Sequence, residues 1–184
     1  MRWEALFSDF EAQLAEADRA GLEAEIRELV WVEQAGISLE GRLRGNSGAP
    51  VDVVLCGGLR FRGEIGDVAE SWFSLSAGSR SLVVPFSGVV TVAGLGRRSQ
   101  QETSAVRRGL SLASALRALA RARAQVVCHL GGPSGDPLVV AGTIDGVSRD
   151  YVELAQKRVD ARGAQASTTT LVSLAALVAV VSPA

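Results

Sequence analysis

Several residue types that support common catalytic chemistries are nearly missing from this chain of 184 residues. It has one histidine, His129, and two cysteines, Cys56 and Cys128. A histidine acting as general base needs a nucleophile and an orienting acid nearby, and no motif supplies them. One histidine and two separated cysteines are also too few for a recognisable zinc site. We therefore expect no enzyme, no metal site and no other cofactor, and we interpret His129 as a structural or surface residue.

Lysine is nearly absent as well, since Lys157 is the only one and all other cations are arginines. With its abundant alanine and glycine, this composition is typical of a GC-rich genome such as that of an actinobacterium. The net charge of −1 gives no overall attraction to nucleic acid or acidic lipid. However, nine acids and three arginines leave −6 in residues 1–35, and seven arginines and one glutamate leave +6 in residues 97–123. These two segments either face each other or are solvated separately.

The sequence also lacks long hydrophobic runs and an export signal. Its longest apolar stretch, residues 171–181, is shorter than the roughly 20 residues that a membrane-spanning helix needs. The first ten residues carry acids within their apolar pattern, which is unlike a signal peptide. Two thiols without an export signal are typical of a reducing compartment. We therefore expect a cytoplasmic protein with no membrane partner.

What the sequence does contain is an internal repeat. V-V-L-C-G-G (53–58) and L-R-F-R-G-E-I-G-D-V (59–68) match V-V-C-H-L-G (126–131) and L-V-V-A-G-T-I-D-G-V (138–147). Apolar residues alternate with period two in the longer segments, which predicts half-buried strands. Both contain a central glycine, a residue that usually marks a bulge or bend in a strand. Short, bent strands around one small core favour a small barrel.

The repeat resembles a known family. A short helix, a strand of the type V-x-V-x-L-x-x-G, a bent strand with x-G-x-I and a final V-P-F-x-x-V-x-x-V resemble Sm-like (LSm/Hfq) proteins, over roughly residues 37–92 and 110–181. The resemblance implies a mainly β fold with helices (α+β), made of two five-stranded Sm-like barrels in tandem. The RNA-contacting motifs of the family are not retained. Its turn aspartate falls at Ala69 and Ser148, and V-P-F (84–86) and V-S-L (172–174) replace its basic-histidine motif.

The predicted domain order places a helix before each barrel. We expect an acidic amphipathic helix over 1–36, barrel one over 37–96, a basic linker with a helix over 97–123, and barrel two over 124–184. The first helix has an apolar stripe at spacings of four and three, formed by Trp3, Phe7, Phe10 and Leu14. It is either one long helix or a helical hairpin broken at Gly21. We expect the polar stretch 156–169 to be a mobile loop.

The alternation also predicts the cores of the two barrels. The inward positions of the strands are apolar in both copies. We expect the following side chains to be buried: Val53, Leu55, Phe61, Ile65, Phe73, Leu75, Val126, Cys128, Val140, Ile144, Val152 and Leu154. The outward positions of the second strand are charged in the first copy but apolar in the second, so the second copy needs a cover.

Two functional hypotheses remain open. The first is a non-catalytic scaffold or interaction protein that binds itself, as a dimer rather than a ring of three chains, or an unknown protein partner. Its candidate interface residues are Trp3, Phe7, Phe10, Leu14, Trp72, Tyr151 and Val139. The alternative is an RNA-binding regulator, because clustered arginines can position phosphates. Its candidate residues are Arg60, Arg62, Arg80, Arg97, Arg98, Arg107 and Arg108. We favour the simpler interpretation of these arginines as solvated surface residues.

Overall fold

The computed structural model describes residues 16, 19, 21–23, 25–32, 34–104, 107, 109–132, 137–159 and 165–183. Its contacts divide the chain into two units, Met1–Ser38 and Leu39–Ala184. In the first unit, the described residues up to 35 are helical, Gly21 included. Leu22, Ile26 and Leu29 are exposed on this helical segment. The predicted stripe of Trp3, Phe7, Phe10 and Leu14 lies outside the described residues.

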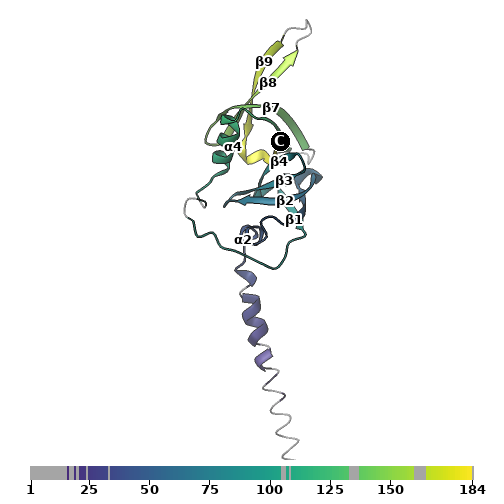
Figure 1. The fold of residues 1–184 in the computed structure, drawn as a ribbon, viewed down its shortest axis with the longest axis vertical. Coiled ribbons are helices and arrows are strands. Elements are labelled where there is room, and N and C mark those ends of the chain that lie inside the picture. Colours follow the sequence, from purple (N-terminus) through teal and green to yellow (C-terminus); the bar gives the residue numbers. More distant parts are fainter. Residues whose placement is uncertain are drawn as a thin grey trace, which may run out of the picture. The chain divides into compact units, whose positions relative to one another are not determined.

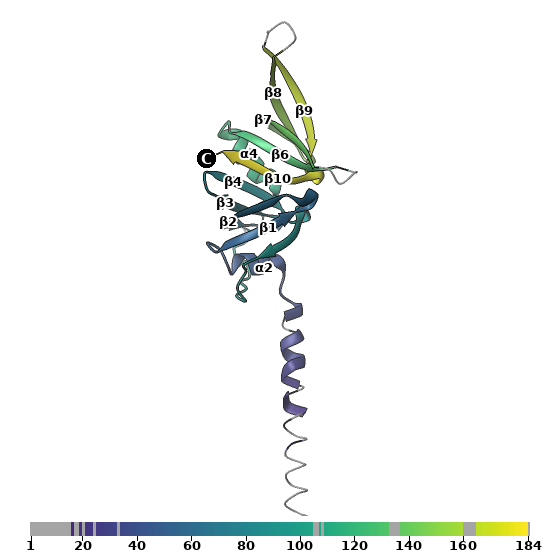
Figure 2. The same cartoon turned by 90° about the vertical axis from the view of Figure 1, so that its right-hand side faces the viewer.

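The second unit is built on one antiparallel sheet of ten strands (Figures 1 and 2). The first half contributes β1 (Pro50–Leu55), β2 (Arg60–Val68), β3 (Trp72–Ala77), β4 (Arg80–Pro85) and β5 (Val89–Ala93). The second half contributes β6 (Gln125–Gly131), β7 (Pro137–Val147), β8 (Tyr151–Val159), β9 (Gln165–Ser173) and β10 (Leu177–Pro183). The strand order is β5-β1-β2-β3-β4-β10-β6-β7-β8-β9.

Only short helices accompany this sheet in the described part of the second unit. They are α2 (Leu39–Arg44), α4 (Leu112–Arg121) and the single 3-10 turns η1 (Cys56–Gly58), η2 (Phe86–Gly88) and η3 (Leu174–Ala176). The side chain of Ser111 caps α4 by accepting a hydrogen bond from the Ser114 amide. None of the helices in the described ranges combines the length and the apolar stretch that a bilayer crossing requires.

The prediction of two separate five-stranded barrels after a long N-terminal helix is wrong, because the two halves share one open sheet. Strand β4 pairs with β10, with Val83 opposite Val180, and β10 also pairs with β6. The cause lies in the sequence of β10, which is apolar on both faces. Val178 and Val181 pack in the core of the first half, whereas Val180 packs in that of the second. A strand buried on both faces takes a central place in a sheet.

The internal repeat is visible in the strand pairing, but with a different alignment of the first strand. Val51 lies opposite Gly63, and Val126 lies opposite Gly142. Val51 therefore corresponds to Val126, whereas the sequence comparison paired Val53 with Val126. A shift of two residues keeps every side chain on the same face, so the apolar pattern could not detect it.

Each half has its own hydrophobic core. Leu43 of α2 joins the first core and Leu116 of α4 joins the second. Ten of the twelve predicted core residues are buried, and Phe61 and Val140 are only half-buried. Cys56 begins η1, where it is half-exposed.

The expected mobile loop over 156–169 is also wrong for its described residues. They extend β8 and β9 into a long hairpin, with Gln156 opposite Thr168 and Val159 opposite Gln165 (Figure 1). Threonine and valine favour strands, and Thr170 donates a hydrogen bond of 2.7 Å to the Gln156 side chain. Residues 160–164 lie outside the described part of the chain.

The linker between the halves is anchored to the first half. The indole of Trp72 donates a hydrogen bond of 3.1 Å to the carbonyl of Leu110. Glu102 lies 3.4 Å from the guanidinium of Arg44, which also pairs with Glu40 of α2. These partly buried contacts fix the path of the linker, which sequence periodicity gave no means to predict.

Candidate functional site

A cavity lies where β10 joins the two halves. Its volume is about 540 Å³, and we call it the junction cavity. It is lined by Leu59, Arg60, Phe61, Arg80, Val127, His129 and Val181. Strand alternation explains its second-half wall, because Val126 and Cys128 face the second core and Val127 and His129 must then face the other way. The second half thus presents these two side chains to the first half.

His129 has an unusual environment in this cavity. Its ring meets that of Phe61 edge to face, with 6.1 Å between the centroids and 71° between the planes. Its Nδ1 atom is buried and has no hydrogen-bond partner. Burial lowers the pKa of His129 below its ordinary value, which favours the neutral imidazole. A buried polar atom without a partner costs free energy, so this ring has hydrogen-bonding capacity that the protein does not use.

Two arginines give the junction cavity a positive charge. Arg60 begins β2 and Arg80 begins β4, and both side chains are exposed. Neither forms an ion pair or a side-chain hydrogen bond within the described residues, and no carboxylate belongs to the lining. A neighbouring cavity of about 440 Å³ shares Arg60 and Phe61. There, Arg62 lies 3.9 Å from Asp52, so part of its charge is compensated.

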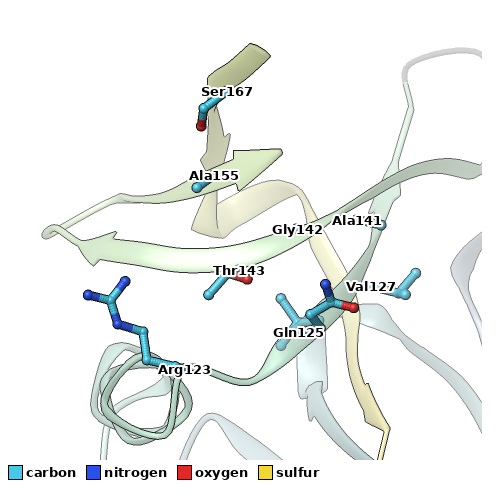
Figure 3. A pocket seen from close by; sticks show the side chains of 9 residues that line it. Arg123, Gln125, Val127, Ala141, Gly142, Thr143, Ala155 and Ser167 are labelled. Carbon is cyan, nitrogen blue, oxygen red and sulfur yellow. The ribbon is translucent and has the colours of Figure 1, made fainter. Parts of the chain in front are cut away.

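A second cavity, of about 530 Å³, is lined by Arg123 and by residues of β6, β7, β8 and β9 (Figure 3). Arg123, after the end of α4, lies on one side of β7, and Ala155 and Ser167 lie on the other. The guanidinium of Arg123 is 3.5 Å from the carboxylate of Asp145. Because its charged group already has a partner and its other lining groups are mostly small, this cavity is a weaker candidate than the junction cavity.

The two outer strands of the sheet, β5 and β9, are further candidate sites. Within the described residues, β5 pairs only with β1, and β9 pairs only with β8. Val90 on β5 is 58% exposed and Leu171 on β9 is 62% exposed. An apolar strand edge with open hydrogen-bonding groups is a template for pairing with another chain. We call β5 and β9 the free edges.

The structure divides the predicted RNA-binding arginines among separate places. Arg60 and Arg80 share the junction cavity, and Arg62 lies in the cavity beside it. Arg107 lines a small cavity of about 220 Å³ near α2. The remaining described members, Arg97 and Arg98, are exposed after β5, and their backbone carbonyls accept hydrogen bonds from Arg42 and Asn46. Arg108 lies outside the described residues.

The predicted interface residues also separate. Trp72 and Tyr151 occupy equivalent positions, opposite Pro85 and Ser173 respectively. Trp72 is buried against the linker and Tyr151 is half-buried, so neither presents a fully open face. Val139 is 51% exposed on β7. The other four, Trp3, Phe7, Phe10 and Leu14, lie outside the described residues.

Sequence reasoning missed the position of His129, which it treated only as a structural or surface residue. Its place beside Phe61 depends on the pairing of β4 with β10, and no local pattern reveals a contact between strands so far apart in sequence. In the part of the chain that the structure describes, no group of three or more His, Cys, Asp or Glu side chains could hold a metal ion. No family model matches the chain, and no curated protein matches it either.

Proposed function

We propose that this chain is a non-catalytic scaffold protein that assembles with copies of itself, head to tail, through its two free edges. The β9 edge of one copy pairs with the β5 edge of the next. The observation that carries this proposal is the β4–β10 pairing inside the chain, because the free edges are the counterparts of these two strands. That pairing joins the fourth strand of one half to the fifth strand of the other. The other fourth and fifth strands, β9 and β5, each have one edge without a partner within the described residues.

The internal pairing serves as a control for the free edges. Thr91 lies opposite Val54, and Ala179 lies opposite His129, so β5 and β10 can be compared residue by residue. On this alignment Val90 corresponds to Val178. Val90 is 58% exposed, whereas Val178 is 4% exposed because β4 and the η2 turn adjoin β10. The exposed residues of β5 are therefore those that an equivalent partner strand would cover.

The same comparison predicts the register between two copies. Val180 lies opposite Val83 inside the chain, and these residues correspond to Val92 and Leu171. Pairing of β5 with β9 thus places Val92 opposite Leu171 and covers an exposed leucine. Covering each exposed Val or Leu contributes about 1–2 kcal/mol, a part of the full burial value.

The exposed apolar face of β7 fits this arrangement. Val139 and Leu138 correspond to Arg60 and Leu59, which line the junction cavity next to β6. In the assembly, β1 of the second copy takes the place that β6 takes inside the chain. The partner therefore approaches Val139 and Leu138 and covers this exposed apolar face.

Head-to-tail contacts give a closed ring or an open filament, depending on the rotation between copies. Two chains joined by two β5–β9 contacts form a closed dimer, and three chains form a larger ring. We keep the dimer as our prediction, in the cytoplasm, where the free thiols of Cys56 and Cys128 would stay reduced. The resemblance to Sm-like proteins also stays a prediction.

A mixing experiment tests the proposal. The Val90→Lys chain has a damaged β5 edge and an intact β9 edge, and the Leu171→Lys chain has the reverse. Each variant alone should lose the assembly, because every contact needs both edges. An equimolar mixture should regain one contact and form only pairs of chains, measured by sedimentation velocity. The double variant gives the mass without edge contacts, and Leu39→Lys, at an exposed leucine of α2, is the matched control.

Two results would contradict the proposal. Single variants that keep the mass of the parent would show that the edges do not hold the assembly. A mixture that stays at the mass of the double variant would show that the contact is not head to tail.

RNA binding remains the second candidate function, favoured by the guanidinium groups of Arg60 and Arg80, which have no ion-pair partner among the described residues. Titration with short RNAs at several salt concentrations tests it. Contacts with phosphates give an affinity that falls steeply as salt rises. Absence of binding at low salt would remove this candidate.

A further inference from the structure

We propose that the junction cavity binds a small organic anion, which carries a carboxylate or phosphate group on an apolar or aromatic body. The cavity, of about 540 Å³, has the size of a small-molecule site. Its lining combines two guanidinium groups and one imidazole with apolar side chains. Such a mixture of a mostly apolar wall and a few converging polar groups is typical of ligand pockets.

The internal repeat shows that the fold does not require these polar residues. The strand pairings make Val54 the counterpart of His129, and Val139 the counterpart of Arg60. Thr168, opposite Gln156, is the counterpart of Arg80, which lies opposite Ala77. The same strand positions in the other half are thus uncharged. The two arginines and the histidine occur together only at the junction within one chain.

The lining assigns a part of the ligand to each side chain. Leu59, Val127 and Val181 form an apolar wall, and the rings of Phe61 and His129, which meet edge to face, add two aromatic surfaces. A guanidinium group can form two parallel hydrogen bonds with a carboxylate or phosphate. Arg60 and Arg80 therefore bind the oxyanion group. Burial lowers the pKa of His129 and so favours its neutral ring, which can supply one hydrogen bond to the ligand.

The distribution of charge favours a small ligand over a nucleic acid strand. A single-stranded polynucleotide needs cations along its path and aromatic platforms for successive bases. Here the next arginine along β2, Arg62, is 3.9 Å from Asp52, and Arg107 lies in a different cavity, near α2. Arg60 and Arg80 are thus the only cationic side chains that line the junction cavity, and the other predicted arginines lie apart from it. Because one chain forms the whole lining, this inference does not depend on self-assembly.

Isothermal titration calorimetry on the full chain tests the inference with four probes. These are 2-naphthoate, 2-naphthyl phosphate, the neutral 2-naphthalenemethanol and inorganic phosphate. We expect one of the two aromatic anions to bind with one site per chain, and the neutral compound and phosphate alone to bind roughly tenfold more weakly or worse. The preferred aromatic anion distinguishes a carboxylate ligand from a phosphate ligand.

The variants use residues that the repeat already accepts at these positions. Arg60→Val and Arg80→Thr should each weaken binding of the preferred anion by roughly tenfold or more. His129→Val should weaken it by a smaller factor. Arg62→Ala, on the same strand but outside the junction cavity, is the matched control and should leave the affinity unchanged. Circular dichroism confirms that each variant is folded, and Arg60→Lys, which keeps the charge but not the paired donors, replaces Arg60→Val if that chain is unfolded.

Several outcomes would overturn the inference. The first is the absence of binding by either aromatic anion. The second is equal binding of 2-naphthalenemethanol, which would show only an apolar surface. The third is an affinity that Arg60→Val, Arg80→Thr and Arg62→Ala leave unchanged. Tighter binding of a short RNA than of 2-naphthyl phosphate, lost in the same variants, would assign the cavity to nucleic acid. The double variant Val90→Lys/Leu171→Lys should bind the anion as the parent does, whether or not the chain assembles.

Discussion

Replacement of Gly63 by alanine probes the close approach of strands β2 and β3 in the first half. A Cβ atom at position 63 would lie 2.3 Å from the carbonyl oxygen of Ser76 on the neighbouring strand, whereas ordinary contact begins at 3.4 Å. Strands β2 and β3 would have to separate locally by about 1 Å, and the obstacle is backbone rather than a movable side chain. We expect a loss of about 3 kcal/mol in the free energy of unfolding, the upper end for overpacking.

Two other glycines make this prediction a graded series. At Gly142, the equivalent position in the second half, a Cβ would lie 2.7 Å from the carbonyl oxygen of Ala155, so we expect a smaller loss of about 1–2 kcal/mol. At Gly131 it would meet Val178 at 3.6 Å, an ordinary contact, so Gly131→Ala should be nearly neutral. Urea denaturation at one protein concentration, followed by circular dichroism, measures all three. A Gly63→Ala chain as stable as the parent, or more stable than Gly142→Ala, would refute this account of the close approach.

Three further predictions follow from burial. Ile65→Ala should lower the free energy of unfolding by roughly 2–5 kcal/mol, measured by urea denaturation. Phe61→Ala should lower it by less, because the phenyl ring is only half-buried. Folding lowers the pKa of His129, so as the pH falls the unfolded chain binds a proton at this residue before the folded chain does. The free energy of unfolding should therefore fall as pH drops below about 6.5. This contribution to the pH dependence should be absent in His129→Val. Burial raises the pKa of the Cys128 thiol to about 11, so a disulfide-exchange reagent at pH 8 should modify Cys56 in the folded chain and Cys128 only after unfolding.

Local patterns predicted the strands and most of the core, because period two and mid-strand glycines are properties of short segments. Ile65, Phe73 and Leu154 are buried as their alternation indicates. The joining of β4 to β10 could not be predicted in this way. The apolar run of β10 is equally compatible with a strand inside one barrel and with a strand shared by two cores. Which arrangement forms depends on packing between segments about a hundred residues apart.

The candidate sites were only partly visible in the sequence. Outward alternation correctly placed Arg60 and Arg62 on the exposed face of β2. It could not show that Arg60, Arg80 and His129 line one cavity, because they come from three strands and two halves. The sequence showed that the outer face of the second strand is charged in the first copy and apolar in the second. It did not show the β4–β10 pairing, with which the free edges of β5 and β9 can be compared.

The double role of β10 has a consequence for how the chain folds. During synthesis this strand follows the other nine, and until it is in place β4 has an open edge and the first core lacks Val178, Ala179 and Val181. The first half therefore cannot complete its folding ahead of the second, as an independent domain would during translation. Contacts of such long sequence separation slow folding. Because one strand completes both cores, the two halves should also unfold together, in a single cooperative transition.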